Sequence, residues 1–164
     1  MTDSPPALTP AQLAAYFAFT EVSALLRPSV EKQLREVGGL SYVQFQLLAR
    51  LGDDPEGQQR MTDLADGVVH SRSGLTYQVQ LLVQRGLVVR SASPDDERST
   101  VVAITGAGRD VLAKVFPGHI DTVRDLLFTP VTNDDAEHLA RILGLVSARL
   151  RAAPPRSARK RTAS

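Results

Sequence analysis

Residues 61–105 place two short helical segments directly before two β-prone runs, an order that few small folds accommodate. The first segment covers residues 61–67, and the second runs from Ser71 to about Arg85, where Gly86 ends it. The β-prone runs then flank a turn rich in Pro and Asp, which is typical of a hairpin. Two short helices, a tight connection and a hairpin make up the winged helix-turn-helix plan.

Further helices, three long and one short (residues 42–51), are predicted on both sides of this module, because apolar residues recur there at helical spacing. They cover residues 10–37, 42–51, 106–128 and 133–152. Pro28 is expected to kink the first of these helices without ending it, since the apolar periodicity continues beyond it.

Four local signals mark where these helices begin, end or bend. The Gly38-Gly39 pair is a stop signal, while Ser41 and Thr105 are placed to cap the helices that follow them. The Pro117-Gly118 pair predicts a kink or a break. The expected fold class is mainly α with a small β-hairpin wing (α+β), that is, a winged helix-turn-helix flanked by dimerisation helices.

Composition and patterning together suggest how the chain is divided. We expect residues 1–7 to form a flexible N-terminal arm and residues 153–164 a basic disordered tail. Residues 38–105 form the winged helix-turn-helix domain. Residues 8–37 and 106–152 form a helical region whose apolar stripes need a partner surface.

The residue types that carry much of enzyme chemistry are missing or scattered. The chain has no cysteine, which excludes disulfides, thiolate catalysis and Cys-ligated zinc. His70, His119 and His138 are spread too widely to suggest a metal site or a catalytic base. No motif resembles a nucleophile with a positioned base or a phosphate-cradling loop. We therefore expect neither an enzyme nor a bound metal or cofactor.

The start of the chain does not resemble a signal peptide, and no apolar run approaches the roughly 18 residues that span a bilayer. A cytoplasmic protein without a membrane partner is the expectation. The net charge of +1 says little about nucleic acid, but four basic residues and no acid follow Pro155. Without those four, the 18 acidic residues outnumber the bases, so DNA binding by the body must depend on locally clustered charge. The tail either adds phosphate affinity or only solubilises the chain.

The segment from Ser71 to Arg85 has two faces when its residues are placed at 100° per residue. A narrow apolar stripe is expected to be buried, and it consists of Leu75, Val79 and Leu82. The second face has hydroxyls, an aromatic ring and an amide but no carboxylate, and it consists of Ser73, Thr76, Tyr77 and Gln80. A solvated surface helix more usually carries Glu and Lys, so this face favours insertion into a DNA groove.

Each polar residue on that face has a plausible contact with DNA. Gln80 can pair with adenine through two hydrogen bonds, and Thr76 can touch a thymine methyl or a base edge. Tyr77 can pack on a sugar or donate to a phosphate.

The first turn of the same segment suggests a phosphate contact. Ser71, Ser73 and the helix N-terminus can bind a phosphate through hydroxyl and backbone N–H groups. Arg72 adds a mobile charge for phosphate or guanine. The simpler alternative for Ser71 is an N-cap alone, and both roles are compatible.

The hairpin tip provides a second candidate contact. Asp96 and Arg98 can pair so that the carboxylate orients the guanidinium outward. An arginine at the end of a hairpin can enter a narrow minor groove, where the potential is most negative. The alternative is that the pair only stabilises the turn.

Several of these stretches together resemble the MarR (multiple antibiotic resistance regulator) family of regulators. Ser71-Arg-Ser-Gly-Leu-Thr and Gln84-Arg-Gly-Leu-Val88 look like the recognition helix of that family. Asp96-x-Arg98, followed by Val101-Val-Ala-Ile-Thr-Gly-Ala-Gly108, looks like its wing and the start of its fifth helix. Phe116-Pro-Gly-His119 and the closing Leu-rich helix are also similar, so the resemblance covers about residues 8–152.

The resemblance implies a triangular homodimer, in which the first, fifth and sixth helices interleave across the two-fold axis. Such a dimer binds double-stranded DNA at a roughly palindromic site. The implied function is sequence-specific transcriptional regulation, with repression as the main expectation. The alternative is a winged-helix protein–protein adaptor without DNA binding, which predicts an acidic or apolar recognition face.

The sequence also departs from the family pattern at two places. The wing carries Ser91, Ser93 and Glu97 where many relatives have more strongly charged residues, which predicts a weaker or more selective contact. The recognition helix carries Tyr77 and Gln80 where relatives often have charged residues. The operator therefore cannot be inferred from a relative.

The resemblance further implies a small-molecule effector, often an aromatic acid or a phenol, bound between the dimer helices and the winged domain. Tyr42 and Phe45 on the second helix, with Tyr16 and Phe17 on the first, are candidates to line that cleft. Core packing explains the phenylalanines equally well, and Tyr42 is the best single candidate because its hydroxyl could meet a carboxylate. The absence of tryptophan disfavours urate.

Overall fold

The computed structural model describes residues 7–67, 72–93 and 96–152. The chain forms two compact units, Met1–Val123 and Arg124–Ser164, and each is considered by itself. Among the helices of the described residues, none combines the length and apolarity needed to cross a lipid bilayer.

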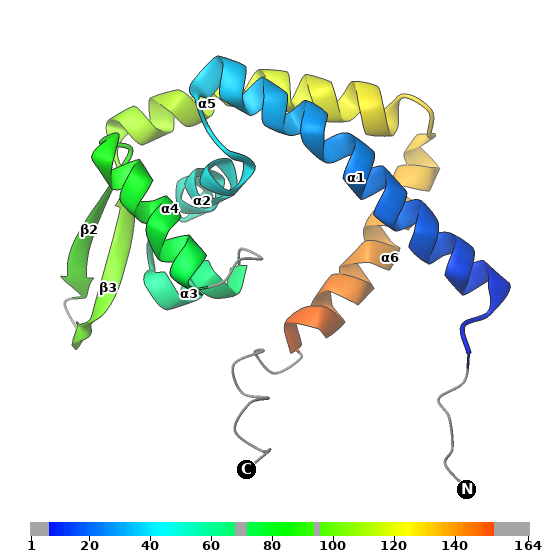
Figure 1. Ribbon diagram of the computed structural model, residues 1–164, viewed down its shortest axis with the longest axis horizontal. Coiled ribbons are helices and arrows are strands. Elements are labelled where there is room, and N and C mark those ends of the chain that lie inside the picture. Colours follow the sequence, from blue (N-terminus) through cyan, green and yellow to red (C-terminus); the bar gives the residue numbers. More distant parts are fainter. Residues whose placement is uncertain (1–6, 68–71, 94–95, 153–164) are drawn as a thin grey trace, which may run out of the picture. The chain divides into compact units, whose positions relative to one another are not determined.

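The two units are mainly helical (Figure 1). The first contains α1 (Pro10–Gly38), α2 (Tyr42–Asp53), β1 (Gln58–Arg60), α3 (Met61–Gly67), α4 (Arg72–Gln84), β2 (Val88–Ser93), β3 (Asp96–Ile104) and α5 (Gly106–Val123). The second contains a π-helix (Arg124–Phe128) and α6 (Asn133–Ala152). The predicted mainly helical fold with a small β wing is thus confirmed.

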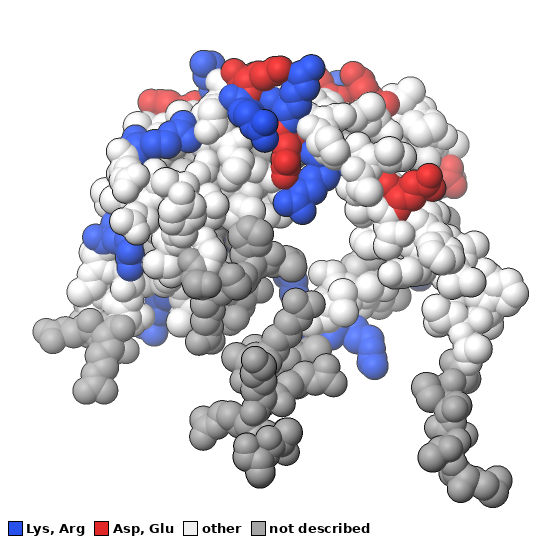
Figure 2. All heavy atoms as spheres, in the orientation of Figure 1, with Lys and Arg blue, Asp and Glu red and all other residues white. Residues whose placement is uncertain are grey.

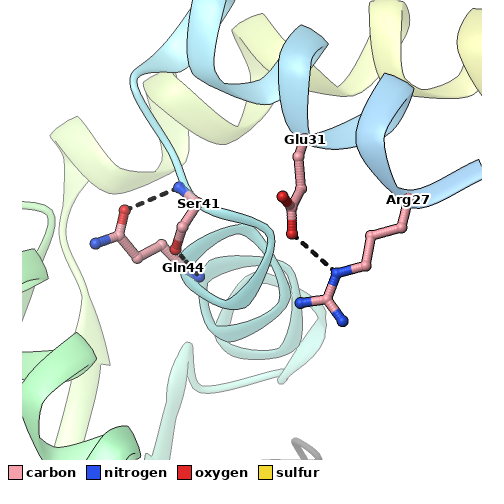
Figure 3. Close-up of polar contacts among 4 residues, drawn as sticks. All are labelled: Arg27, Glu31, Ser41 and Gln44. Carbon is pink, nitrogen blue, oxygen red and sulfur yellow. Dashed lines mark hydrogen bonds and ion pairs between the residues drawn. The ribbon is translucent and has the colours of Figure 1, made fainter. Parts of the chain in front are cut away.

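Reciprocal capping boxes start α1 and α2. At α2, the hydroxyl of Ser41 accepts from the backbone N–H of Gln44 at 3.2 Å, and the Gln44 amide oxygen accepts from the Ser41 N–H at 3.1 Å (Figure 3). Thr9 and Gln12 make the same pair of bonds at α1. These contacts satisfy backbone N–H groups that a helix start leaves without intrahelical partners. Ser41 is therefore the N-cap that the sequence predicts.

The two internal prolines leave their helices unbroken. α1 continues through Pro28, as expected, and α5 continues through Pro117, where the sequence allows a kink or a break. At that point α1 supports α5, because Gln33 Nε2 donates to the carbonyl of Val115 at 3.0 Å. Gly118 leaves space for this side chain, since a Cβ there would lie 2.6 Å from Gln33 Nε2. The predicted helix over residues 106–128 instead changes to π geometry from Arg124.

The wing belongs to a three-stranded antiparallel sheet with the order β1-β3-β2. β2 and β3 form the predicted hairpin, with a register shift between Ala92 and Ser93. β1 is not predicted from the sequence, because Gln58-Gln59-Arg60 is short and polar. It forms because its backbone pairs with β3, placing Gln59 opposite Val102.

The hydrophobic core of the first unit lies around α2, α4 and the sheet. Helices α1 and α5 contribute Val30, Leu34 and Val115 to it. From α4, the predicted apolar stripe is buried, with exposed fractions of 1% for Leu75, 1% for Val79 and 0% for Leu82. Burial of that stripe fixes which side of α4 faces outward.

Large apolar side chains remain exposed in both units. On the N-terminal part of α1 they include Leu13, Tyr16, Phe17, Phe19, Val22 and Leu25. α6 has no buried residue, and Leu139, Ile142, Leu145, Val146 and Leu150 are exposed on it. In Figure 2 the starting end of α1 shows almost only uncharged atoms. Each of these helices therefore presents apolar surface that the described residues of its own unit leave uncovered.

Candidate nucleic-acid interface

The polar face of α4 points away from the core. Thr76, Tyr77 and Gln80 are exposed, and Tyr77 is 60% exposed despite its aromatic ring. Because the opposite stripe is buried, the helix cannot rotate without exposing three core residues. The arrangement provides a fixed helix with hydrogen-bonding groups and one ring on its outer side.

The C-terminal end of α4 is tied to the hairpin. Gly86 has a positive φ of 70°, and its N–H donates to the carbonyl of Val83 at 2.9 Å. The N–H of Leu87 donates to the carbonyl of Leu82 at 3.0 Å, which completes a Schellman motif. Thr105 Oγ1, after β3, donates to the carbonyl of Gly86 at 2.7 Å. The end of α4 and both wing strands are therefore held together.

The N-terminal part of the candidate surface is only partly described. Arg72 and Ser73 lie in the first turn of α4, where backbone N–H groups of a helix are free to bind an anion. Ser71 lies outside the described residues. The phosphate contacts of Ser71, Arg72 and Ser73 therefore stay predictions.

The wing is the second part of the candidate surface. Asp96 and Arg98 lie at the start of β3, but their side chains are outside the described part, so their pairing stays a prediction. Arg90 on β2 is exposed and was not among the predicted contacts. The sequence could have indicated Arg90 as a contact, because it is the sole ionisable residue of that strand. Figure 2 shows basic side chains along the strands, with uncharged surface around them.

The four candidate ligand residues form two separate groups within the chain. Tyr16 and Phe17 are exposed on α1, with their ring centroids 5.6 Å apart. Tyr42 lies below Arg27, whose Cζ is 5.5 Å from the ring centroid. Since Arg27 follows Tyr16 by eleven residues on α1, about 16 Å of helix separates the two groups. The four side chains therefore do not line a single cleft in one protomer.

Tyr42 and Phe45 have different surroundings. Arg27 Nε also pairs with Glu31 at 2.9 Å (Figure 3). This ion pair holds the guanidinium near Tyr42. Phe45 is 6% exposed and packs against the ring of His119, so its core-packing role is observed. Tyr42 remains the more accessible of the two.

A separate surface hollow lies between α2 and α5. Its volume is about 350 Å³ and its lining is mainly apolar, formed by Gly52, Arg109, Leu112, Ala113, Phe116 and Pro117. None of the four predicted ligand residues is among them. Sequence patterning did not identify this hollow, because it arises where two helices far apart in the chain pack together.

In the described part of the chain, neither His119 nor His138 belongs to a group of side chains that could hold a metal ion. Partial burial lowers the pKa of His119 from its ordinary value. His138 Nδ1 lies 2.7 Å from the carbonyl of Asp134, one turn earlier in α6, and His70 is outside the described residues. Over residues 7–67, 72–93 and 96–152, no group of three or more His, Cys, Asp or Glu side chains is arranged to hold a metal ion.

The fold matches those of known regulators. A family model described as MarR family matches residues 38–99. The crystal structure of Sco3205, a MarR family transcriptional regulator from Streptomyces coelicolor in complex with DNA, is 31% identical to this chain. The match has a TM-score of 0.84 and covers 93% of this chain and 95% of that one. The chain belongs to the MarR family.

Two further relatives are consistent with this MarR assignment. AbsC, a MarR family transcriptional regulator from Streptomyces coelicolor, is 28% identical with a TM-score of 0.80, covering 89% of this chain and 98% of that one. The HTH-type transcriptional regulator MhqR from Bacillus subtilis (strain 168) is 32% identical over 89 residues. That match covers 54% of this MarR-family chain and spans 60% of the relative's length. Because these relatives are transcriptional regulators, the expectation that the chain is not an enzyme is confirmed.

Proposed function

We propose that this MarR-family chain is a homodimeric, sequence-specific DNA-binding repressor that binds a palindromic operator. Residues 38–105 form its DNA-binding domain, and residues 8–37 and 106–152 supply its dimerisation helices. The observation that carries the proposal is the exposed, carboxylate-free polar face of α4, held outward by the buried stripe behind it. That combination suits a helix that enters the major groove.

DNA contacts divide by position along α4 and the wing. Gln80 and Thr76 contact base edges, while Tyr77 contacts the sugar-phosphate backbone. The first turn of α4, with Ser71, Arg72 and Ser73, binds phosphate. Arg98 enters the minor groove from the wing, with Asp96 orienting it. The related Sco3205 was solved in complex with DNA, which supports this general mode of binding.

The proposed dimer explains the exposed apolar side chains. A monomer would leave the apolar residues of α1 and α6 in water, at a cost that scales with their area. A second copy of the chain brings the same surfaces and can cover them symmetrically. Two α4 helices in one dimer then face two half-sites about one helical turn apart.

Release from DNA is assigned to a small effector, an aromatic acid or a phenol. Tyr42 supports this class, since it is near the surface and lies beside the Arg27 guanidinium. Tyr16 and Phe17 can join Tyr42 and Phe45 at one site only if they come from the partner protomer, because α1 separates them within one chain. Effector binding then changes the spacing of the two α4 helices.

A gel-shift assay with genomic fragments and excess nonspecific competitor DNA tests the proposal. We expect one or a few fragments to be retarded at moderate salt, with a footprint that is two-fold symmetric. Absence of specific retardation would contradict DNA-binding regulation and favour the protein–protein adaptor. Adding phenol and benzoate-type compounds to the retarded complex then tests the effector class.

A further inference from the structure

The side chain of Arg85, directly after α4, reaches back to the end of α1. Its Nη1 donates to the carbonyl of Gly39 at 2.8 Å, and its Nη2 donates to the carbonyl of Gly38 at 2.9 Å. The two partners are 46 and 47 residues earlier in the chain. The guanidinium thus bridges two neighbouring carbonyls with both of its terminal nitrogens.

The end of α1 is shaped to receive this side chain. Gly39 is the C-cap of α1, with a left-handed φ of 61°, and its N–H is already used by the carbonyls of Arg35 and Leu34. The last carbonyls of a helix lack intrahelical partners and carry partial negative charge. A planar cation with parallel donors satisfies two of them at once, which a single ammonium group cannot do with the same geometry.

The same turn is fixed on its other side by α5. A Cβ on Gly38 would collide with Val115 Cγ1 and would lie 3.4 Å from Val111 Cγ1, so the glycine allows α5 to pack closely. Val115 is completely buried. The two carbonyls that accept hydrogen bonds from Arg85 are therefore part of a closely packed contact between α1 and α5.

The backbone of Arg85 is equally well fixed. Its N–H donates to the carbonyl of Leu81 at 3.2 Å, and the Schellman motif at Gly86 and Leu87 follows immediately. A displacement of α4 would therefore pull the guanidinium away from the end of α1. Hydrophobic packing alone is non-directional, whereas a two-pronged hydrogen bond has a defined geometry.

We propose that Arg85 is a positioning residue that fixes the direction of α4 relative to α1. This inference rests on the proposed function, because α1 helps to form the dimer and α4 binds the operator. The link then sets how far apart the two α4 helices lie. Arg85 itself contacts no base, and its effect on DNA binding acts through α4.

A distance measurement within one protomer tests the link without DNA and without assuming a dimer. Because the chain has no cysteine, Lys32→Cys on α1 and Gln80→Cys on α4 provide two unique sites for spin labels. Labelled protein is mixed with an excess of unlabelled protein, so that any dimer contains at most one labelled chain. We expect a narrow distance distribution in the otherwise unchanged chain and a broader one with Arg85→Ala.

Two variants separate geometry from charge. Arg35→Ala removes the same charge from the last turn of α1, at an exposed residue, and is expected to leave the distribution narrow. Arg85→Lys keeps the charge but loses the two-pronged contact, so an intermediate width is expected. Melting temperatures show whether each variant is folded.

Operator fragments with altered spacing provide the functional readout. Half-sites are moved one base pair closer together or further apart, and affinities for each spacing are measured. With Arg85→Ala, affinity for the best spacing should fall about two- to tenfold, the range for the net contribution of one hydrogen bond. The preference for the best spacing over its neighbours should shrink as well, which a loss of stability alone would not produce.

Equally wide distance distributions for the unchanged chain and Arg85→Ala would overturn the proposal, whatever the operator-binding measurements show. A width for Arg85→Lys equal to that of the unchanged chain would overturn the role of the two-pronged geometry. A broadened distribution with an unchanged spacing preference would overturn the effect on DNA binding. If the unchanged chain binds no DNA specifically, the proposed function fails, while the distance measurement still decides whether Arg85 holds α4.

Discussion

The imidazole of His119 packs against the ring of Phe45 in a tilted arrangement, with the centroids 4.5 Å apart and 50° between the planes. This contact joins α5 to α2 across the core of the first unit. Nδ1 of His119 is buried and has no hydrogen-bond partner among the described residues, and burial lowers the pKa of the imidazole. The folded chain therefore favours the neutral ring.

We expect His119 to make stability depend on pH. The unfolded chain binds a proton at a pH near the ordinary value, whereas the folded chain resists protonation until the pH is lower. The contribution of the neutral His119 ring to the free energy of unfolding is therefore complete above about pH 6.5, and it is lost as the pH falls toward the folded-state pKa. Urea unfolding at several pH values from about 5 to about 8 measures this effect. The free energy of unfolding should depend less steeply on pH for His119→Gln than for the unchanged chain.

The matched control is His138→Gln, which changes an exposed histidine in the second unit. Its urea midpoints should follow those of the unchanged chain at each pH. Parallel curves for His119→Gln and the unchanged chain would show that His119 does not titrate differently on folding.

Glycine at 108 is needed because the start of α5 lies against the backbone of Leu87, directly before β2, and against Ile104 at the end of β3. A Cβ there would collide with the carbonyl oxygen of Leu87 and would lie 2.8 Å from Ile104 Cγ1. Gly108→Ala should lower the free energy of unfolding by about 1–3 kcal/mol, as expected for overpacking. Gly106→Ala is the control, since no atom lies within 4 Å of its added Cβ. Equal urea midpoints for the two variants would contradict the close approach of α5 to Leu87 and Ile104.

Gln80 is expected to determine base preference at one operator position. Gln80→Ala should cost about 1–3 kcal/mol of discrimination there, because the bidentate contact is lost, while the fold is unaffected. Gln84→Ala removes the same side chain one turn later, at the end of α4, and should change the preference less. Competition binding with operators substituted at each position measures both effects. A base preference unchanged by Gln80→Ala would remove Gln80 from the proposed base contacts.

Arg98 is expected to add affinity without affecting the dimer. Arg98→Ala should weaken operator binding by about 1–3 kcal/mol, because the minor-groove contact and its charge are lost. Lys114→Ala removes an exposed charge from α5 and should have a smaller effect. Fluorescence anisotropy at several salt concentrations, with light scattering for the oligomeric state, separates the two properties. Unchanged affinity with Arg98→Ala would mean that the wing makes no contact.

The exposed apolar surface of α1 leads to a prediction about assembly. Leu25 is 70% exposed, and Leu25→Glu should shift the protein from dimer to monomer, since burying an unpaired carboxylate is costly. Val89→Glu makes the same kind of change at a 53% exposed residue of β2 and should leave the dimer intact. Light scattering coupled to size exclusion distinguishes these outcomes. A Leu25→Glu dimer as stable as the original would place the interface elsewhere.

Much of the fold was predictable because its signals are local. The apolar spacing of Leu75, Val79 and Leu82 correctly predicted the buried side of α4, and Ser41 correctly marked the start of α2. β1 was missed because three polar residues have no β signal of their own and become a strand only by pairing with β3. The continuity of α5 at Pro117 was likewise invisible, because the supporting hydrogen bond comes from Gln33 on another helix.

The candidate site was predictable to the same extent. The exposed positions of Thr76, Tyr77 and Gln80 follow from helical periodicity alone. The separation of Tyr16 from Tyr42 does not follow from helical periodicity, because it depends on which part of α1 lies beside α2. The two hydrogen bonds from Arg85 to Gly38 and Gly39 are also long-range contacts, and no spacing rule connects residues so far apart in the chain.

The capping boxes at Thr9 and Ser41 are built entirely from neutral groups, a hydroxyl, an amide and two backbone N–H groups. Neither ionic strength nor moderate pH changes alter such bonds appreciably, whereas contacts between arginine and phosphate weaken steeply as salt is added. The helix starts should therefore survive conditions that strip the protein from DNA. A rise in salt would then detach a fully folded molecule, ready to rebind when the salt falls.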